Sequence, residues 1–486
     1  MLASLILALP VFSALTVLVT RWRRFTPWIG VGADAAVLVV GLMAALHEVR
    51  SPALLGMAGV LRVDALSGFM VVVIGAVSVL ASWGSVRYLR HEVVTNACSA
   101  RQALHYSVLI QLFVASMLLA VSAANIGVMW VAVEATTITT TFLVGHRRSR
   151  AALEASWKYL VICSVGIALA FLGTVVLYLA AQHAGGNATQ ALEWTWLSAH
   201  ARSFDPAVVR TAIGLLVLGY GAKVGLVPLH SWLPDAHSQA PAPVSALMSG
   251  VLLSVALYAL LRFKAIAVMS VGEHFVRTLF IVLALATLIL ASLLLVTQRD
   301  LKRAFAYSST EHMGLMALAV AAGGPLAISG VLLHMLGHGL AKGVLFLATG
   351  EVVAVDGTSD IEATSGLFAR RPALGGAVAL GLAAILGFPP FSLFVSELTM
   401  IRGEIAVHLV WAVALSLAAL ALAFAALATH ARRLLMEEGR DLVLAQPTPA
   451  SAMVPLVVGL SLCAFIGVST WPLGPVLSAA ARLAVS

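Results

Sequence analysis

The stretch K-V-G-L-V-P-L-H-S-W-L-P-D-A-H-S-Q-A-P-A-P runs from Lys223 to Pro243, inside a long apolar region of the chain. Each proline in it removes a helix hydrogen bond and kinks or splits a helix. The prolines are Pro228, Pro234, Pro241 and Pro243. A positive charge, Lys223, stands at the start of the stretch. We therefore predict a membrane helix that is broken beside a buried charge.

A second stretch, G-F-P-P-F-S-L-F-V-S-E from Gly387 to Glu397, repeats this pattern with Pro389, Pro390 and a buried acid. In the order of apolar segments, the two breaks fall in the seventh and twelfth spans, which are five helices apart and run in opposite directions. Broken helices at equivalent places are typical of inverted repeats with the functional site at the breaks. We predict N-terminal helices 1–3 in 1–102, a first inverted five-helix repeat (helices 4–8) in 103–263, a second (helices 9–13) in 264–430, and helix 14 in 431–486.

The composition indicates an all-α polytopic membrane protein. Of the 486 residues, 61% are hydrophobic and 10% are charged. Apolar segments of about 17 residues or more can cross a hydrocarbon core of ~30 Å, and in lipid such runs must be helical. We predict about fourteen spans, with boundaries uncertain by roughly two to four residues. They are 2–20, 27–46, 66–86, 103–120, 124–144, 155–181, 208–229, 241–263, 275–297, 303–322, 327–350, 373–396, 405–430 and 452–470.

The basic residues predict the orientation of these helices. One set of alternate loops, which includes Arg21, Arg87, Arg101 and Arg147, carries roughly twice as many basic residues as the other set. The positive-inside rule places this set in the cytoplasm and both chain termini outside. The first segment has neither a basic start nor an A-x-A-like cleavage site, so we expect a retained helix. The net charge of +8 thus reflects topology, and no nucleic-acid partner is expected.

Charged side chains within the spans need a partner, water or a role, because each costs ~2.5–3.5 kcal/mol at the bilayer centre. Glu134 and Lys223 lie at comparable depth, which suggests an ion pair. Such a pair can act as a proton gate, because pairing holds the lysine protonated and opening releases its proton. The alternative is a static bridge that fixes two helices.

His334, His338 and Lys342 are spaced at i, i+4 and i+8, which stacks them on one helix face over ~12 Å. Histidine titrates near neutral pH, so this row can relay protons through water. Polar packing among the neighbouring glycines is the alternative. A metal site is disfavoured because no carboxylate or cysteine lies nearby in the sequence.

Five further ionisable residues have two possible roles each. Glu397 is either the terminal acid of the relay or a helix cap. Glu311 and His312, which follow Y-S-S-T, either line a water path or bridge helices. Asp235 and His237 face a cytoplasmic entrance or only satisfy the proline-rich turn.

No cofactor site is readable in the sequence. The three cysteines, Cys98, Cys163 and Cys463, stand far apart and form no metal-binding pattern, so structural packing accounts for them. G-V-G-A-D-A at 30–35 resembles a loose dinucleotide motif, but it follows no strand and lies in an apolar helix. Asp64 is expected to cap a helix start. We predict no catalytic residue, no cofactor and no metal.

Four motifs in order resemble the antiporter-like subunits of respiratory complex I, a family that includes Mrp-type cation/proton antiporter subunits and membrane chains of energy-converting [NiFe] hydrogenases. They are K-V-G-L-V-P-L-H-S-W-L-P-D-A-H-S-Q-A-P-A-P-V-S-A-L (223–247), D-L-K-R-A-F-A-Y-S-S-T-E-H-M-G (300–314), H-M-L-G-H-G-L-A-K-G (334–343) and G-F-P-P-F-S-L-F-V-S-E (387–397). W-V-A-V-E (130–134) and W-K-Y-L-V-I-C-S-V-G-I-A (157–168) are similar to the F chain of hydrogenase-4.

The resemblance implies roles for the buried charges. Glu134 and Lys223 would form the gating pair, Lys342 with His334 and His338 the central relay, and Glu397 the outer acid. Family members commonly carry another lysine or a histidine in span 8. Here Ser249 and Ser254 lie near the expected places, so the link to the central relay would run through serines and water.

The resemblance also implies a function and partners. We expect a proton-translocating subunit, without redox chemistry or a cofactor of its own, in an energy-converting, complex I-like oxidoreductase, namely a membrane-bound [NiFe] hydrogenase of hydrogenase-4 type. The alternatives are a complex I antiporter-like subunit and an Mrp-type sodium/proton antiporter subunit. Expected partners are other membrane subunits, a peripheral redox arm and the lipid bilayer, in a bacterial or archaeal cell (inner) membrane.

Overall fold

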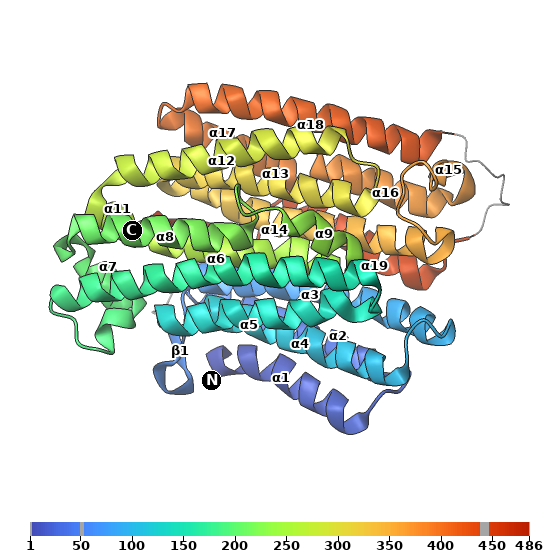
Figure 1. Cartoon of the computed structure of the whole chain (residues 1–486), viewed down its shortest axis with the longest axis horizontal. Helices are drawn as coiled ribbons and strands as arrows, with labels where there is room; N and C mark the ends of the chain where they lie inside the picture. Colours follow the sequence, from blue (N-terminus) through green and yellow to red (C-terminus); the bar gives the residue numbers. More distant parts are fainter. Residues whose placement is uncertain (1, 49–52, 438–446, 486) are drawn as a thin grey trace.

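The computed structural model describes residues 2–48, 53–437 and 447–485 as a bundle of helices that run side by side along its long axis (Figure 1). The N-terminal long helices are α1 (Leu2–Thr20), α2 (Thr26–Glu48) and α3 (Ala65–Val94). They are followed by α4 (Ala100–Ser122), α5 (Ile126–Val144), α6 (Arg150–His183), α8 (Pro206–Val224), α9 (Trp232–Gln239), α10 (Ala242–Leu247), the π-helix η5 (Met248–Leu252) and α11 (Leu253–Val271).

The second half of the chain contributes α12 (Glu273–Val296), α13 (Leu301–Ala322), α14 (Gly324–Asp356), α16 (Pro372–Ile385), α17 (Ser392–Ala406), α18 (Val410–Met436), α19 (Ala450–Val468) and α20 (Gly474–Val485). Two short helices, α7 (Trp194–His200) and α15 (Leu367–Arg370), lie in loops. Short 3-10 turns span Met57–Gly59, Gly145–Arg147, Gln190–Leu192 and Ala201–Ser203. The strands β1 (Leu54–Gly56) and β2 (Leu61–Val63) pair antiparallel between α2 and α3.

Twelve helical segments within the described residues are long and apolar enough to cross a membrane. The predicted spans 303–322 and 373–396 are not among them. The first corresponds to α13, which carries too many polar residues, and the second to α16 and α17, which are separate short helices. The helical membrane fold is therefore confirmed, whereas the count of fourteen and the inverted repeats remain predictions.

Both predicted helix breaks are present. The first separates α8 from α9: Gly225 ends α8 with a φ of +87°, and residues 225–231 are not helical. Backbone groups freed by the break find side-chain partners, because Trp232 Nε1 donates to the Ala222 carbonyl at 2.8 Å and Thr287 Oγ1 accepts from the Val227 amide at 3.0 Å. The second break, with Gly387 at a φ of +69°, separates α16 from α17.

Three helical segments form the interior of the bundle. They are α3, the continuous segment α10–η5–α11, and α14. In each of them, at least nine-tenths of the residues in the most apolar stretch are buried. α14 packs against helices from both halves of the chain, among them α3, α10, α13 and α17. Side chains that α14 presents to these neighbours are therefore shielded from lipid.

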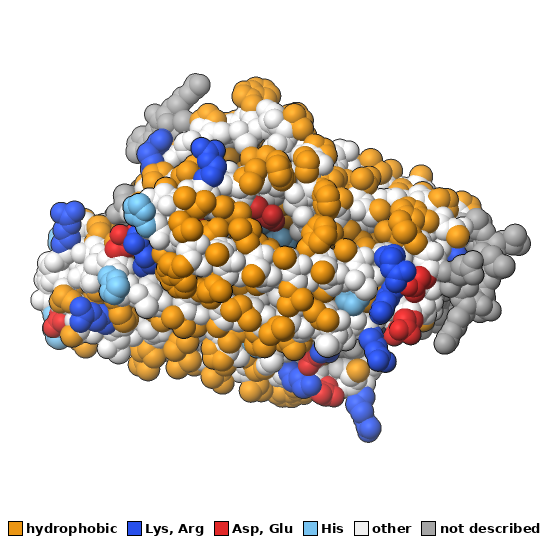
Figure 2. Space-filling model, turned by 90° about the horizontal axis from the view of Figure 1, so that it is seen from above, with side chains coloured by type: hydrophobic (Ala, Val, Ile, Leu, Met, Phe, Trp, Pro, Cys, Tyr) orange, Lys and Arg blue, Asp and Glu red, His pale blue; other side chains and the backbone are white. Residues whose placement is uncertain are grey.

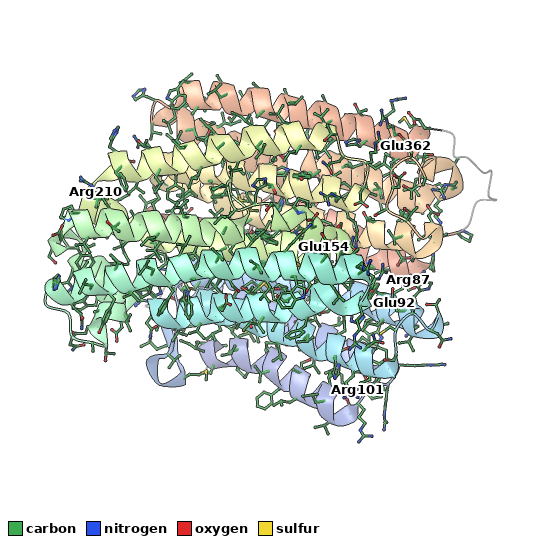
Figure 3. The ribbon with its side chains drawn as sticks, viewed as in Figure 1. Arg87, Glu92, Arg101, Glu154, Arg210 and Glu362 are labelled. Atoms are coloured by element: carbon green, nitrogen blue, oxygen red, sulfur yellow. The ribbon has the colours of Figure 1, made fainter. Side chains whose placement is uncertain are left out.

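Charged side chains mark the two ends of the bundle. Arg87 and Arg101 lie at one end, which we call the basic end, and Arg210 lies at the opposite end (Figure 3). α1 begins, and α20 ends, toward the end that carries Arg210 (Figure 1). This placement of the helix ends agrees with termini on one side and the Arg87 and Arg101 loops on the other.

Candidate functional site

Lys223 is fully buried in the last turn of α8, next to the first helix break. Its ammonium donates hydrogen bonds to Thr137 Oγ1 at 2.8 Å and to Tyr159 Oη at 2.7 Å. The Tyr159 hydroxyl also lies 2.6 Å from Thr140 Oγ1. Because the lysine can only donate, the Tyr159 proton is free to be donated to Thr140. Lys223 thus begins a chain of hydroxyl groups across α5 and α6.

Glu134 does not contact Lys223 directly in this structure, and the predicted gating pair stays a prediction. No ion pair within 4.0 Å joins the two side chains as the described residues lie. Thr137 stands between them: its hydroxyl accepts from Lys223 and donates to Glu134 Oε2 at 3.2 Å. Ser164 donates to the other carboxylate oxygen at 3.3 Å. Thr137 can bond to Glu134 because it lies three residues after the acid, on the same face of α5.

The row on α14 is buried as the spacing predicts, and side chains of α13 extend it. His334, His338 and Lys342 have no exposed surface. His334 Nε2 lies 3.1 Å from His312 Nδ1, and the His312 and His338 ring centroids are 5.3 Å apart. Lys342 donates to the Phe305 carbonyl at 2.9 Å. Four ionisable side chains from two helices therefore meet in the interior.

His338 has no hydrogen-bond partner on either ring nitrogen among the described residues. It is nevertheless fully buried, and a neutral imidazole has one donor and one acceptor. Buried polar groups are rarely unpaired, and ordered water commonly supplies the partner. The position of His338 therefore favours a hydrated interior.

Glu311 joins this row through its neighbour. Its Oε2 lies 3.6 Å from His312 Nε2, and its Oε1 has no partner in the described part of the chain. Both side chains point into the interior, where each is about 2% exposed. Of the two roles left open by the sequence, their place beside the α14 histidines favours the water path.

Glu397 reaches the row from α17, after the second helix break. Its carboxylate and ligand atoms of His312 and His334 all lie within 4.8 Å of one another. Ser396 Oγ lies 2.9 Å from His334 Nδ1, which also ties α17 to α14. α17 begins at Ser392 and has no side-chain cap, so Glu397 lies beyond the first turn and is not a cap.

The position of Glu397 explains why residue 387 is a glycine and leaves the acid partly exposed. A Cβ atom on Gly387 would lie 2.6 Å from Glu397 Oε2, so the glycine makes room for the carboxylate. Figure 2 shows an acidic side chain in a hollow of an otherwise apolar face, with a histidine behind it. Glu397 is itself partly exposed.

The same three residues could ligate a metal. Two imidazoles and one carboxylate are ligands that Zn²⁺ accepts. The prediction against a metal was based on the lack of a nearby carboxylate in sequence, and that reason is wrong because Glu397 comes from another helix. The geometry alone leaves a proton relay and a metal site both chemically feasible.

The serines of span 8 and the polar residues of the first break differ in whether they have hydrogen-bond partners. Ser249, on η5, lies 2.6 Å from Ser309 Oγ of α13, whereas Ser254 Oγ is buried without a partner among described residues. His237 is also buried, and neither of its ring nitrogens has a described partner. Asp235 is ion-paired with Arg303 and, at 3.2 Å, with Lys158, so it is not a free acid.

Several buried polar residues were missed by the sequence analysis. Lys302, which stands just before the predicted span 303–322, is buried and donates to the Ala240 carbonyl at 2.7 Å, at the end of α9. Asp34 and Glu404 are fully buried acids in apolar helices. An acid within an apolar run was the signal for both. The hydroxyl run T-T-I-T-T-T at 136–141 likewise pointed to the Lys223 contacts.

Two minor predictions hold. Asp64 caps α3 by accepting from the Ser67 amide at 3.0 Å, and it also pairs with Arg262 at 2.6 Å. The three cysteines are free and buried, as structural packing requires.

A helical membrane bundle with two broken helices and an interior row of lysine, histidine and acid defines an antiporter-like, multi-pass membrane protein. Residues 123–423 match the family described as NADH:quinone oxidoreductase/Mrp antiporter, TM, and the chain belongs to this family. The family resemblance drawn from the motifs is thereby confirmed.

The relatives include chains of hydrogenase-4. The chain is 40% identical over 346 residues to the hydrogenase-4 component F homolog of Methylacidiphilum infernorum (isolate V4), a match that covers 71% of this chain and 72% of the relative. It is 30% identical over 370 residues to hydrogenase-4 component B of Escherichia coli (strain K12), covering 74% of this chain and 53% of that longer protein. The protein is thus a homologue of hydrogenase-4 membrane components.

A solved structure supports the same fold. A chain of the membrane-bound sulfane sulfur reductase (MBS), an archaeal respiratory membrane complex, matches with a TM-score of 0.88 and 25% identity. The match covers 100% of this chain and 98% of that one.

Proposed function

We propose that this protein is a proton-translocating membrane subunit of a complex I-like oxidoreductase, of the hydrogenase-4 type. The observation that carries the proposal is the interior row of Lys342, His338, His334 and His312, which leads to Glu397. Groups of this kind inside a membrane mark proton pathways, because each can gain and lose a proton where water reaches it.

The Lys223 site suits a switch at one end of the pathway. The ammonium is held by two hydroxyls and has no carboxylate within 4.0 Å among the described residues. Hydroxyls stabilise a buried charge less than a carboxylate does. A small movement that replaces Thr137 by Glu134 as the partner of Lys223 would therefore favour the charged lysine, and the reverse movement would favour proton release.

His237 and the span 8 serines supply the link to the central row. The His237 ring stacks on the Phe346 ring of α14 with centroids 5.3 Å apart, one helical turn from Lys342. Ser249 connects η5 to α13 through Ser309. With water at the unpartnered nitrogens of His237, these groups bridge the two helix breaks without a further lysine.

The orientation and the repeats are part of the proposal. The basic end would face the cytoplasm of a bacterial or archaeal cell, and both termini would lie outside its inner membrane, as the positive-inside rule indicates. Helices within 103–263 and 264–430 would form the two inverted repeats, between the N-terminal helices of 1–102 and the C-terminal part of 431–486. The partners would be other membrane subunits and a peripheral redox arm.

The test is proton transport by the intact complex in inverted membrane vesicles, measured together with electron transfer. Lys223→Ala and Glu397→Ala should abolish redox-driven proton uptake while the complex still assembles. Glu154→Gln is the control for loss of an acid, because Glu154 is exposed and pairs only with Lys158 among described residues. Wild-type pumping by both alanine variants would refute the proposal. Uptake that requires sodium would favour the Mrp-type antiporter instead.

A further inference from the structure

Asp34 is a fully buried acid on α2. α2 precedes α13 and α14, the helices that carry the central row of lysine and histidine side chains, in the chain. Its Oδ2 accepts hydrogen bonds from the Ser82 hydroxyl and, at 3.3 Å, from Gln111 Nε2. Its Oδ1 has no partner, and no basic side chain lies within 4.0 Å, among the residues the structure describes. An ionised carboxylate in such a place is costly, whereas a protonated one is neutral and can donate.

The neighbouring helices offer no charge that would hold Asp34 ionised. α1 has no ionisable side chain, and the one of α20, Arg482, is exposed. The ionisable residues of α3 lie in its last two turns, and α4 contributes Tyr106 closest to the site. The ionisable residues of α3 and α4 are Arg87, Tyr88, Arg90, His91, Glu92, Arg101, His105 and Tyr106.

A polar stripe on α3 leads from Asp34 toward the basic end. Ser78, Ser82 and Ser85 are buried at spacings of four and three residues, which places them on one helix face. Ser85 Oγ lies 2.9 Å from Tyr106 Oη of α4. The hydroxyl groups of Ser85 and Tyr106 therefore continue from Ser82 toward the basic end.

Two cavities meet at Tyr106. A small one of about 10 Å³, room for one water molecule, is lined by Ser82, Ser85, Tyr106 and Gln111. A larger one of about 510 Å³ is lined by Tyr106 and by loop and helix-end residues that include His146 and Arg148. The larger cavity lies near Arg101 and thus toward the basic end (Figure 3). The Tyr106 side chain lines both cavities.

We propose that Asp34 is a second proton-binding site, loaded from the basic end past Tyr106 and separate from the central row. A proton from water in the larger cavity passes by way of Tyr106 and the small cavity to Asp34 Oδ1. The carboxylate becomes a carboxylic acid and the donor water regains its proton from solvent. A proton fits better than a sodium ion, because Gln111 presents its amide nitrogen to the carboxylate.

The first test uses dicyclohexylcarbodiimide, which reacts with protonated carboxylic acids in apolar surroundings. The purified intact complex is treated at neutral pH, and the modified residues are mapped by mass spectrometry of peptides. We expect an adduct on Asp34 that is lost in Asp34→Asn. Asp64 is the internal control, because it is buried but ion-paired with Arg262 and should remain unmodified. An unmodified Asp34 in the wild-type complex would overturn the proposal.

The second test does not require the Asp34 variant to fold. Infrared spectra of the wild-type complex should contain the carbonyl stretch of a protonated acid that shifts in D₂O. In Tyr106→Phe this shift should develop more slowly, because the phenol on the route is missing, while the adduct level on Asp34 at equilibrium stays the same. Equal exchange rates in the two proteins would overturn the route. Because Asp34 is not part of the central row, these results are independent of the outcome for Lys223 and Glu397.

Discussion

Lys223 Nζ lies 2.8 Å from Thr137 Oγ1, and that hydroxyl is the single group between the lysine and the Glu134 carboxylate. The acid and the base of the proposed gate are therefore coupled through one side chain. The Thr137 hydroxyl can therefore be removed by mutation while Lys223 and Glu134 are both kept.

Thr137→Val keeps the shape of the side chain and deletes the hydroxyl. A hydrogen bond to a charged group is worth about 1.5–3 kcal/mol, so we expect redox-driven proton uptake to fall by about tenfold or more. The matched control is Thr139→Val, because the Thr139 hydroxyl bonds, within the described part of the chain, only to carbonyls of its own helix. Equal uptake by both variants would show that Thr137 has no role in coupling.

Gly387→Ala tests whether Glu397 must occupy its present position. The added Cβ atom would lie 2.6 Å from Glu397 Oε2, and the φ of +69° is unfavourable for alanine. We expect a loss of about 1–3 kcal/mol in stability and a loss of proton uptake. Gly376→Ala, at a helical site with no atom within 4 Å of the new Cβ, should retain both. Proton uptake at the wild-type level in the Gly387 variant would contradict this account of the outer acid.

Metal removal separates the two chemistries open to His312, His334 and Glu397. If these residues relay protons, treating the complex with a membrane-permeant chelator of zinc should leave proton uptake unchanged relative to electron transfer. If they hold a metal, chelation should lower uptake and added Zn²⁺ should restore it. The measurement is the ratio of protons taken up to electrons transferred, so that loss of metal from a redox partner is not mistaken for an effect here.

Asp64→Asn should destabilise the protein at neutral pH. Burial alone would raise the pKa of Asp64, but the Arg262 guanidinium and the Ser67 amide hold it below its ordinary value of 3.8. A carboxyl group whose pKa is lowered by folding stabilises the protein above its unfolded pKa, and this stabilisation is lost as the pH falls through the folded pKa. Leaving the largely buried Arg262 without a carboxylate partner should cost up to about 3–5 kcal/mol.

The pH dependence supplies the control for that variant. The difference in thermal stability between the wild type and Asp64→Asn should persist from neutral pH down to at least pH 3.8 and shrink only below it. A difference that disappears near pH 6 would show that the ion pair is not its origin.

The fold could be predicted from the sequence because its strongest signals are local. The length of the apolar runs predicted the helices, and the clustered prolines predicted both helix breaks. The side-chain partners were harder, since they come from helices far apart in the chain. Thr137 was overlooked because hydroxyls are inconspicuous in an apolar run, and the neighbourhood of Glu397 and His312 depends on how α13 and α17 pack. The burial of Lys302 was overlooked because it depends on how the end of α9 packs against α13.

The close spacing of the interior imidazoles has a consequence for stoichiometry. The His312 and His334 ring centroids are 5.1 Å apart, and those of His334 and His338 are 6.1 Å apart. Two positive charges at ~5 Å repel by about 3 kcal/mol at an effective dielectric constant of 20, which makes double occupancy roughly a hundredfold rarer. If the row conducts protons as proposed, it would carry them in single file, and each passage would deliver one hydrogen ion before the next enters.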